Sequence, residues 1–163
     1  SRSSLKAIEE TVSAVRSLLT GDAVTIQGTH VHLDQVQMQM TPVVAPPLYV
    51  GAMRERSLQL AGRIAEGTIL TGMSSPAYVR WARAHINAGM AQAGRTEHRV
   101  VVYVETKVSV DGASARAAAR ESLLQWWPWA DIHVNALGLG AEVEALAARH
   151  GVAGLAALRR RRV

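Results

Sequence analysis

The chain has 163 residues, 48% of them hydrophobic and 19% charged, so it is long and apolar enough to bury a core and does not belong to the disordered class. It contains no cysteine, which excludes disulfides, cysteine-bound metal clusters and a thiol nucleophile. No apolar stretch approaches the roughly 18 to 20 residues of a membrane-spanning helix, and no apolar secretion segment opens the sequence. We therefore expect a soluble, cytoplasmic protein with no membrane partner.

The formal net charge of +5 does not predict a nucleic-acid partner. Four of the positive charges form one run, Arg159–Arg162, so the remainder of the chain carries only +1. A nucleic-acid surface needs basic residues spread over a face with interleaved aromatic side chains, and this chain has no Phe and only seven Trp and Tyr residues. We expect residues 159–163 to be a basic tail outside the fold.

The first third of the sequence predicts a helix and a hairpin. Residues 4–19 carry an apolar stripe at spacings of three and four, which indicates an amphipathic helix that Gly21 can end. Residues 24–33 form two short alternating runs around Gly28, the pattern of a half-buried β-hairpin.

Three apolar runs then alternate with helical segments. The runs at 47–52, 68–72 and 100–110 predict buried strands, and the last contains eight β-branched or aromatic residues. Helices are predicted at 54–63, 75–93, 113–125 and 142–150. Strands of this type separated by helices indicate successive βα units, so the fold class is α/β with a parallel sheet.

An ordered set of short motifs resembles a known family. The motifs are Leu18–Gly28, Pro47-Leu48-Tyr49-Val50-Gly51-Ala52, Leu60-Ala61-Gly62, Ala65-Glu66-Gly67 and Ala93-Gly94-Arg95. In order and spacing they resemble the luciferase-like oxidoreductases, a superfamily of bacterial luciferase, flavin-dependent monooxygenases and reductases that use the deazaflavin coenzyme F-420. The resemblance extends from about Leu5 to Val110 and is to the methylenetetrahydromethanopterin reductase-like branch.

The resemblance implies a TIM (β/α)8 barrel with FMN or coenzyme F-420 at the carboxyl ends of its strands. The predicted strands then resemble strands 5 to 7, and the hairpin is an insertion. Because three strands cannot close a barrel, we expect residues 1–158 to be the C-terminal part of one barrel domain, inactive as a fragment. The family also implies a small organic substrate and a homo-oligomer for the full-length protein.

Four residues are candidates for cofactor binding: Gly51, Ala52, Met53 and Thr71. The first three end a predicted strand, where a residue without a Cβ lets a planar ring or a ribityl chain approach the backbone. The alternative is a turn that simply needs glycine. Thr71 ends the next strand, where its hydroxyl could bond a ring carbonyl or a substrate oxygen, or else be satisfied by backbone.

Two departures from the family pattern bear on this site. The family usually has a Gly-Pro pair after the first strand end, whereas this chain has Arg54-Glu55, so Arg54 or Arg56 could instead reach an anionic cofactor tail. The family more often has Asp at the position of Glu66, for which we expect a structural role.

Glu105 is a weak candidate for a catalytic residue. Tyr103, Glu105 and Lys107 alternate along the third predicted strand and would share one face, which could be the barrel lumen. Charged pairs in such a lumen commonly serve packing only, which is the alternative.

Histidine and tryptophan pairs and clusters give weaker signals. His30 and His32 could present two metal ligands from one hairpin face, but no third ligand has a supporting spacing, so solvated histidines are favoured and no metal is predicted. Trp126, Trp127 and Trp129 could cover a substrate pocket, pack against a partner subunit or pack at a helix end.

The sequence thus leaves two classes of function open. The first is an oxidoreductase that transfers a hydride or activates oxygen at a flavin-type cofactor. The second is a non-enzymatic binding or assembly module that has lost the cofactor site. Nucleic-acid binding through the basic tail ranks last.

Overall fold

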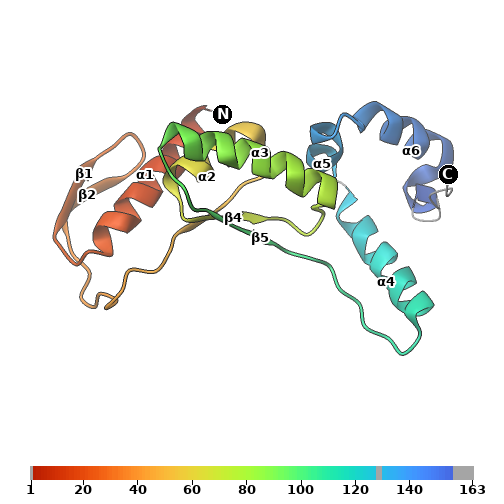
Figure 1. Ribbon diagram of the computed structural model, residues 1–163, viewed down its shortest axis with the longest axis horizontal. Helices are drawn as coiled ribbons and strands as arrows, with labels where there is room; N and C mark the ends of the chain where they lie inside the picture. The colour runs from red at the N-terminus through yellow and green to blue at the C-terminus, as the bar shows by residue number, and fades with distance from the viewer. Residues whose placement is uncertain (1, 128–129, 156–163) are drawn as a thin grey trace. The chain divides into compact units, whose positions relative to one another are not determined.

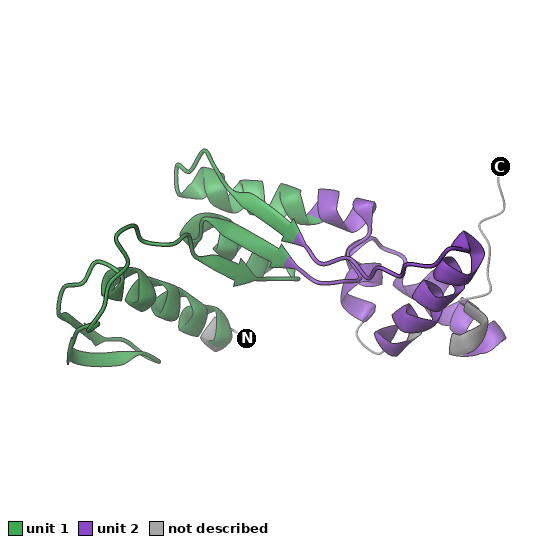
Figure 2. Ribbon diagram, turned by 90° about the horizontal axis from the view of Figure 1, so that it is seen from below, with its two compact units in different colours: residues 1–69, 82–101 green, residues 70–81, 102–163 purple. Residues whose placement is uncertain are grey.

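A computed structural model describes residues 2–127 and 130–155 (Figure 1). By their internal contacts these residues form two compact units, residues 1–69 with 82–101 and residues 70–81 with 102–163 (Figure 2). The elements in chain order are α1 (Arg2–Leu18), β1 (Val24–Gln27), β2 (His32–Val36), β3 (Tyr49–Gly51), α2 (Glu55–Ile64), β4 (Gly67–Leu70), α3 (Pro76–Gln92), β5 (Arg99–Val102), α4 (Gly112–Gln125), α5 (Asp131–Ala136) and α6 (Gly140–Leu155).

The first helix and the hairpin form as predicted. Strands β1 and β2 pair antiparallel, with Ile26 opposite Leu33. A single carboxylate on α1, Glu10, accepts the backbone N–H groups of Thr29, His30 and Val31 at 3.0, 2.7 and 3.1 Å. Because the turn of the hairpin donates these bonds to the ionised carboxylate, led by the one from His30, they lower the pKa of Glu10 to about 2. The helix thus holds the hairpin by its turn.

The three-stranded sheet has the order β3-β4-β5. Strands β3 and β4 are parallel, with Tyr49 opposite Gly67 and Gly51 opposite Ile69. The N–H groups of Arg99 and Tyr103 bond the carbonyls of Glu66 and Leu70, so β5 advances in the same direction as β4. The predicted α/β class and parallel sheet are confirmed.

Helices α2 and α3 pack at very short range through glycines. A Cβ on Gly62 would lie 2.1 Å from the carbonyl oxygen of Ile86, and one on Gly89 would lie 1.9 Å from that of Gln59. Leu58, Leu60 and Ala61 of α2 are buried. The Ser75 hydroxyl accepts the N–H of Tyr78 at 3.2 Å and so caps α3.

The third predicted strand is shorter than expected. We predicted residues 100–110, but β5 ends at Val102, and Val104 and Val108 are 74% and 94% exposed. The last hydrogen bond to the neighbouring strand joins Tyr103 N to Leu70 O, where β4 also ends. β-branched residues favour extended backbone, but a strand needs a hydrogen-bonded neighbour, and none of the described strands continues beside residues 103–110.

The carboxyl-terminal part is helical. The predicted helices at 113–125 and 142–150 correspond to α4 and α6, and Gly151, with φ of 69°, interrupts the second. Helix α5 was not predicted, because six residues are too few to show helical periodicity. The predicted basic tail at 159–163 lies outside the described residues. Within the described residues, every helix falls short of the length and apolarity needed to cross a membrane.

Candidate functional site

The carboxyl end of β3 presents an open backbone. Gly51 is exposed, and a Cβ built on it would meet no atom of the described residues within 4 Å. The next residue, Ala52, is 5% exposed and donates its N–H to Ile69 O at 3.3 Å, while Met53 is half-buried. The sheet therefore fixes the backbone here while leaving the space above Gly51 empty, the condition for close approach of a flat ligand.

The turn after β3 is capped by a serine in place of the family's Gly-Pro pair. The Ser57 hydroxyl accepts the N–H of Arg54 at 3.1 Å and donates to its carbonyl at 2.8 Å, which starts α2. Arg54 has extended backbone, and both Arg54 and Arg56 are exposed. Two guanidinium groups thus follow the open glycine within five residues, and guanidinium groups bind carboxylates and phosphates.

The carboxyl end of β4 carries a second group of side chains. Thr71 follows the strand directly, and its Oγ1 lies 3.1 Å from Nε2 of His133 on α5. His133 is 7% exposed and Tyr78 is fully buried, with their ring centroids 4.3 Å apart. We call these three residues the Thr71–His133–Tyr78 cluster. One partner of the Thr71 hydroxyl is therefore a side chain on α5, and a role of Thr71 in cofactor binding stays a prediction.

Burial keeps this cluster uncharged. It lowers the pKa of His133, against the smaller opposing effect of the nearby Asp131 carboxylate, and it raises the pKa of Tyr78 to about 12. The Nδ1 atom of His133 is buried and has no hydrogen-bond partner among the described residues. His133 has no local motif that predicts a role from the sequence, because its partner Thr71 lies 62 positions away.

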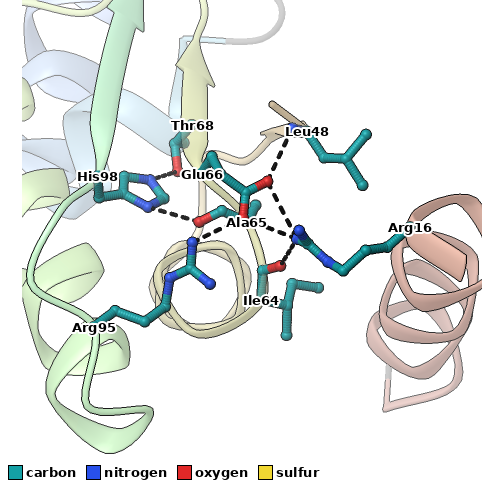
Figure 3. A network of polar contacts seen from close by, with 8 residues as sticks. All are labelled: Arg16, Leu48, Ile64, Ala65, Glu66, Thr68, Arg95 and His98. Atoms are coloured by element: carbon teal, nitrogen blue, oxygen red, sulfur yellow. Dashed lines mark hydrogen bonds and ion pairs between the residues drawn. The ribbon is translucent and has the colours of Figure 1, made fainter. Parts of the chain in front are cut away.

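The amino end of β4 carries a network of charged side chains (Figure 3). There the Glu66 carboxylate accepts the Leu48 N–H at 3.0 Å and forms ion pairs with Arg16 and Arg95 at 3.0 and 2.9 Å. Arg16 also donates to Ile64 O at 2.8 Å. Burial by itself would raise the pKa of Glu66, but the Leu48 N–H and the two guanidinium groups outweigh it and lower the pKa to about 2. The contacts agree with the structural role expected for this residue.

His98 lies beside this network and has a defined tautomer. Its Nδ1 is 3.1 Å from Ala65 O, and its Nε2 is 2.8 Å from Thr68 Oγ1 (Figure 3). A carbonyl oxygen only accepts, so Nδ1 carries the proton and Nε2 accepts the Thr68 hydroxyl. Burial is the main cause of the lowered pKa of His98.

Glu105 lies beyond the end of β5. The prediction that it shares a strand face with Tyr103 and Lys107 is therefore wrong, because none of the described strands continues beside these residues. The Glu105 Oε1 accepts the Ser122 hydroxyl at 2.7 Å and pairs with Lys107 Nζ at 2.9 Å. The Ser122 bond, followed by Lys107, lowers the pKa of Glu105. These contacts tether an ionised carboxylate, and a catalytic role for Glu105 stays a prediction.

The remaining candidates are not brought together. His30 lies in the hairpin turn and His32 opens β2, and no group of three or more His, Asp or Glu side chains in the described part of the chain is arranged to hold a metal. Trp126 is 52% exposed after α4, Trp127 lines a shallow cleft beside α5 and α6, and Trp129 lies outside the described residues. Their roles stay untested.

Comparison with known proteins extends these observations. The family model described as luciferase-like monooxygenase matches residues 2–162. The chain belongs to the luciferase-like monooxygenase family. The luciferase-like chain is 32% identical over 111 residues to an F-420-dependent glucose-6-phosphate dehydrogenase of Nakamurella multipartita, covering 68% of this chain and 33% of that protein. It is 33% identical over 118 residues to a 5,10-methylenetetrahydromethanopterin reductase of Archaeoglobus fulgidus, covering 71% and 35%.

The solved structure of the coenzyme F-420-dependent tetrahydromethanopterin reductase from Methanopyrus kandleri has the same fold over 96% of this chain and 48% of its own, with a TM-score of 0.74 at 22% identity. The expected partial barrel is therefore confirmed as a fold. The luciferase-like chain spans about a third of the length of the curated relatives it matches.

Proposed function

We propose that this luciferase-like chain forms part of the cofactor-binding wall of an oxidoreductase that uses the deazaflavin coenzyme F-420 and acts on a small organic substrate. The observation that carries the proposal is the open backbone at Gly51, at the strand end where barrel enzymes place their chemistry. The names of the curated relatives support F-420 over FMN, and hydride transfer over oxygen activation.

The proposed contacts follow from what each strand end offers. Gly51 admits a flat ring or its side chain against the backbone, and Ala52 and Met53 continue that surface. Thr71 holds a carbonyl or hydroxyl oxygen by a hydrogen bond, and the exposed Arg54 and Arg56 attract an anionic tail. The cofactor, when bound, supplies the carbon that accepts or donates the hydride.

The protein's share of the work is positioning and exclusion of water. The side chains of the Thr71–His133–Tyr78 cluster are neutral and two of them are buried, which favours an oriented hydrogen bond over a solvated one. We also propose a homo-oligomeric state for the complete protein, and a cytoplasmic location stays a prediction from the sequence.

Titration of the purified chain with coenzyme F-420 and with FMN tests the proposal. We expect F-420 to bind more tightly than FMN, and Thr71→Val to weaken F-420 binding. Thr96→Val removes the same hydroxyl from an exposed loop and serves as the matched control, with no expected change. Binding of neither cofactor at millimolar concentration would refute the proposal, and tighter binding of FMN would refute the choice of deazaflavin.

A binding or assembly role is the second candidate. It is favoured by the apolar side chains that residues 103–110 expose, among them Val108 at 94% and Val110 at 110%. A protein partner would cover such a surface. The same titration decides between the two, because the second candidate predicts a folded chain without affinity for either cofactor.

A further inference from the structure

A cleft of about 230 Å³ lies between α5 and α6, away from the strand ends of the candidate site. Trp127, just before α5, lines it, and each helix contributes residues that share one face. These residues are Asp131, Val134 and Asn135 of α5, and Val143 and Glu144 of α6. Because they are spaced three or four positions apart, or directly adjoin such a position, one face of each helix forms one wall.

The turn between the two helices holds these walls in place. Gly138 has a left-handed φ of 71°, and its N–H bonds the Asn135 carbonyl at 3.0 Å. The Leu139 N–H bonds the Val134 carbonyl at 2.9 Å. These two bonds form a Schellman motif, which ends α5 and sets the direction in which the chain leaves it. A Cβ on Gly140 would lie 2.0 Å from Asn135 Oδ1, so α6 begins in direct contact with α5.

Two carboxylates line the cleft without a partner of opposite charge. Asp131 and Glu144 are exposed, and in the part of the chain that the structure describes neither carboxylate takes part in an ion pair or a side-chain hydrogen bond. The carboxylates of Glu10, Glu66 and Glu105, in contrast, each accept hydrogen bonds and lie within 4 Å of a cation. The cleft therefore presents two uncompensated negative charges, one from each helix.

The rest of the lining is largely apolar. Trp127, Val134 and Val143 are half-buried, and Ala130 is 3% exposed. An organic ammonium ion matches this combination, because carboxylates neutralise its charge, aliphatic side chains cover its carbon atoms and an indole ring attracts the cation. A metal ion matches it less well, since no group of three or more His, Asp or Glu among the described residues is arranged to hold one.

We propose that the cleft between α5 and α6 binds a small organic ammonium ion, with Asp131 and Glu144 pairing with its charge and Trp127 covering its alkyl groups. Sites for drug-sized ligands have volumes of roughly 300 to 1,000 Å³, so the ligand here has the size of choline and not of a cofactor. The inference goes beyond the proposed function and does not rest on it. Helix α5 borders both sites, since its His133 lies 3.1 Å from Thr71.

Choline and its uncharged carbon isostere, 3,3-dimethyl-1-butanol, test the proposal on the full chain without cofactor. The two probes have the same shape and differ in the charged nitrogen atom, so their comparison isolates recognition of the charge. In titrations followed by proton–nitrogen NMR, we expect choline to shift the indole N–H of Trp127 and the amides of Asp131 and Glu144 saturably. The isostere should bind at least about 3-fold more weakly. Equal affinity for the two probes, or no saturable shift of these signals with choline, would overturn the proposal.

Variants locate the binding in the cleft. Asp131→Asn and Glu144→Gln each remove one charge at constant size, and each should weaken choline binding about 2- to 5-fold, the effect of one exposed ion pair. Trp127→Leu should cost a similar factor by removing the aromatic face. Glu142→Gln is the matched control, because it removes a carboxylate from the same turn of α6 that does not line the cleft, and it should change nothing.

The outcomes also separate this proposal from the proposed function. Because Asp131 and Glu144 are exposed, their variants should keep the amide spectrum of the wild-type chain outside the cleft. Unchanged choline affinity in both variants, or an equal loss in Glu142→Gln, would overturn the site. Choline binding by a chain that binds neither F-420 nor FMN would support the site and refute the proposed function. Binding of F-420 with no choline shift at Trp127 would overturn the ammonium site alone.

Discussion

The two ends of β4 differ in the side chains that surround them: charged groups at the amino end and neutral groups at the carboxyl end. At the amino end, Glu66 has charged and backbone partners, and Gly67 lies opposite Tyr49, whose ring would be 2.1 Å from a Cβ on that glycine. At the carboxyl end, Thr71 has a neutral histidine partner with one buried atom unpartnered among the described residues. On β3, Gly51 has free space where Gly67 has a ring.

The difference matches the division of labour in barrel enzymes, in which the amino face of the sheet carries stability and the carboxyl face carries chemistry. Ion pairs and a filled glycine site fix the first face. Open backbone at Gly51 and a neutral, largely buried cluster around Thr71 mark the second. Substitutions at the two ends should therefore separate stability from binding.

The largest loss of stability is expected for Glu66→Ala. The substitution leaves Arg16, Arg95 and the Leu48 N–H without their shared acceptor. Because the side chain is 31% exposed, water compensates in part, and we expect a decrease of about 2 to 3 kcal/mol in the free energy of unfolding, measured by urea denaturation. Glu97→Ala, at an exposed site, should cost less than about 0.5 kcal/mol. Equal losses for the two variants would show that the network does not stabilise the fold.

Acid should destabilise the chain in two stages. Glu10 and Glu66 have pKa values of about 2 against an ordinary 4.5, so the unfolded chain protonates first and stability present above pH 4.5 is lost as the pH falls toward 2. The earlier stage comes from His98 and His133, whose pKa values are lowered from 6.5. Because the unfolded chain takes up these protons first, folding stability begins to fall below pH 6.5. Both carboxylate shifts are alike, so Glu66→Gln should remove roughly half of the loss they cause.

The unfolding free energy measured from pH 7 to 2 checks this prediction, with Glu97→Gln as the control. An acid profile that Glu66→Gln leaves unchanged below pH 4.5 would contradict the assignment of the shift to the network.

Gly67→Ala should cost less than the loss of Glu66. The new Cβ meets the ring of Tyr49, which is half-buried and can swing outward. We expect about 1 to 2 kcal/mol of destabilisation and no change in F-420 affinity. A change in affinity larger than the change in stability would place ligand contacts at the amino end and break the comparison.

Gly51→Ala should leave stability almost unchanged, within about 0.5 kcal/mol, because its Cβ meets no atom in the part of the chain that the structure describes. Only a ligand would encounter the added methyl group, so F-420 affinity should fall while the melting temperature stays constant. Thermal unfolding and cofactor titration of the same sample test both halves. Unchanged affinity would remove Gly51 from the proposed site.

The sequence was sufficient for elements whose signal is local. The stripe of α1, the hairpin around Gly28 and the apolar runs of β3 and β4 formed where their periodicity predicted. The length of β5 was overestimated, since Val104 and Val108 fit a strand but a strand also needs a neighbour.

The candidate site residues at the strand ends could be predicted from the sequence. His133, the partner of Thr71, could not. Thr71 is visible as a polar residue after an apolar run. His133 lies on a six-residue helix far along the chain, and only the folded backbone brings its Nε2 to Thr71. Local patterns do not encode a contact of that separation.

Amide chemical-shift mapping of the nitrogen-15-labelled chain with coenzyme F-420 tests the central claim most directly, since it detects millimolar binding residue by residue. We predict the largest shifts at Gly51, Ala52, Met53 and Thr71, with Glu66, Gly67 and Arg95 unaffected. Shifts centred on the amino-end residues, or none at millimolar cofactor, would contradict it.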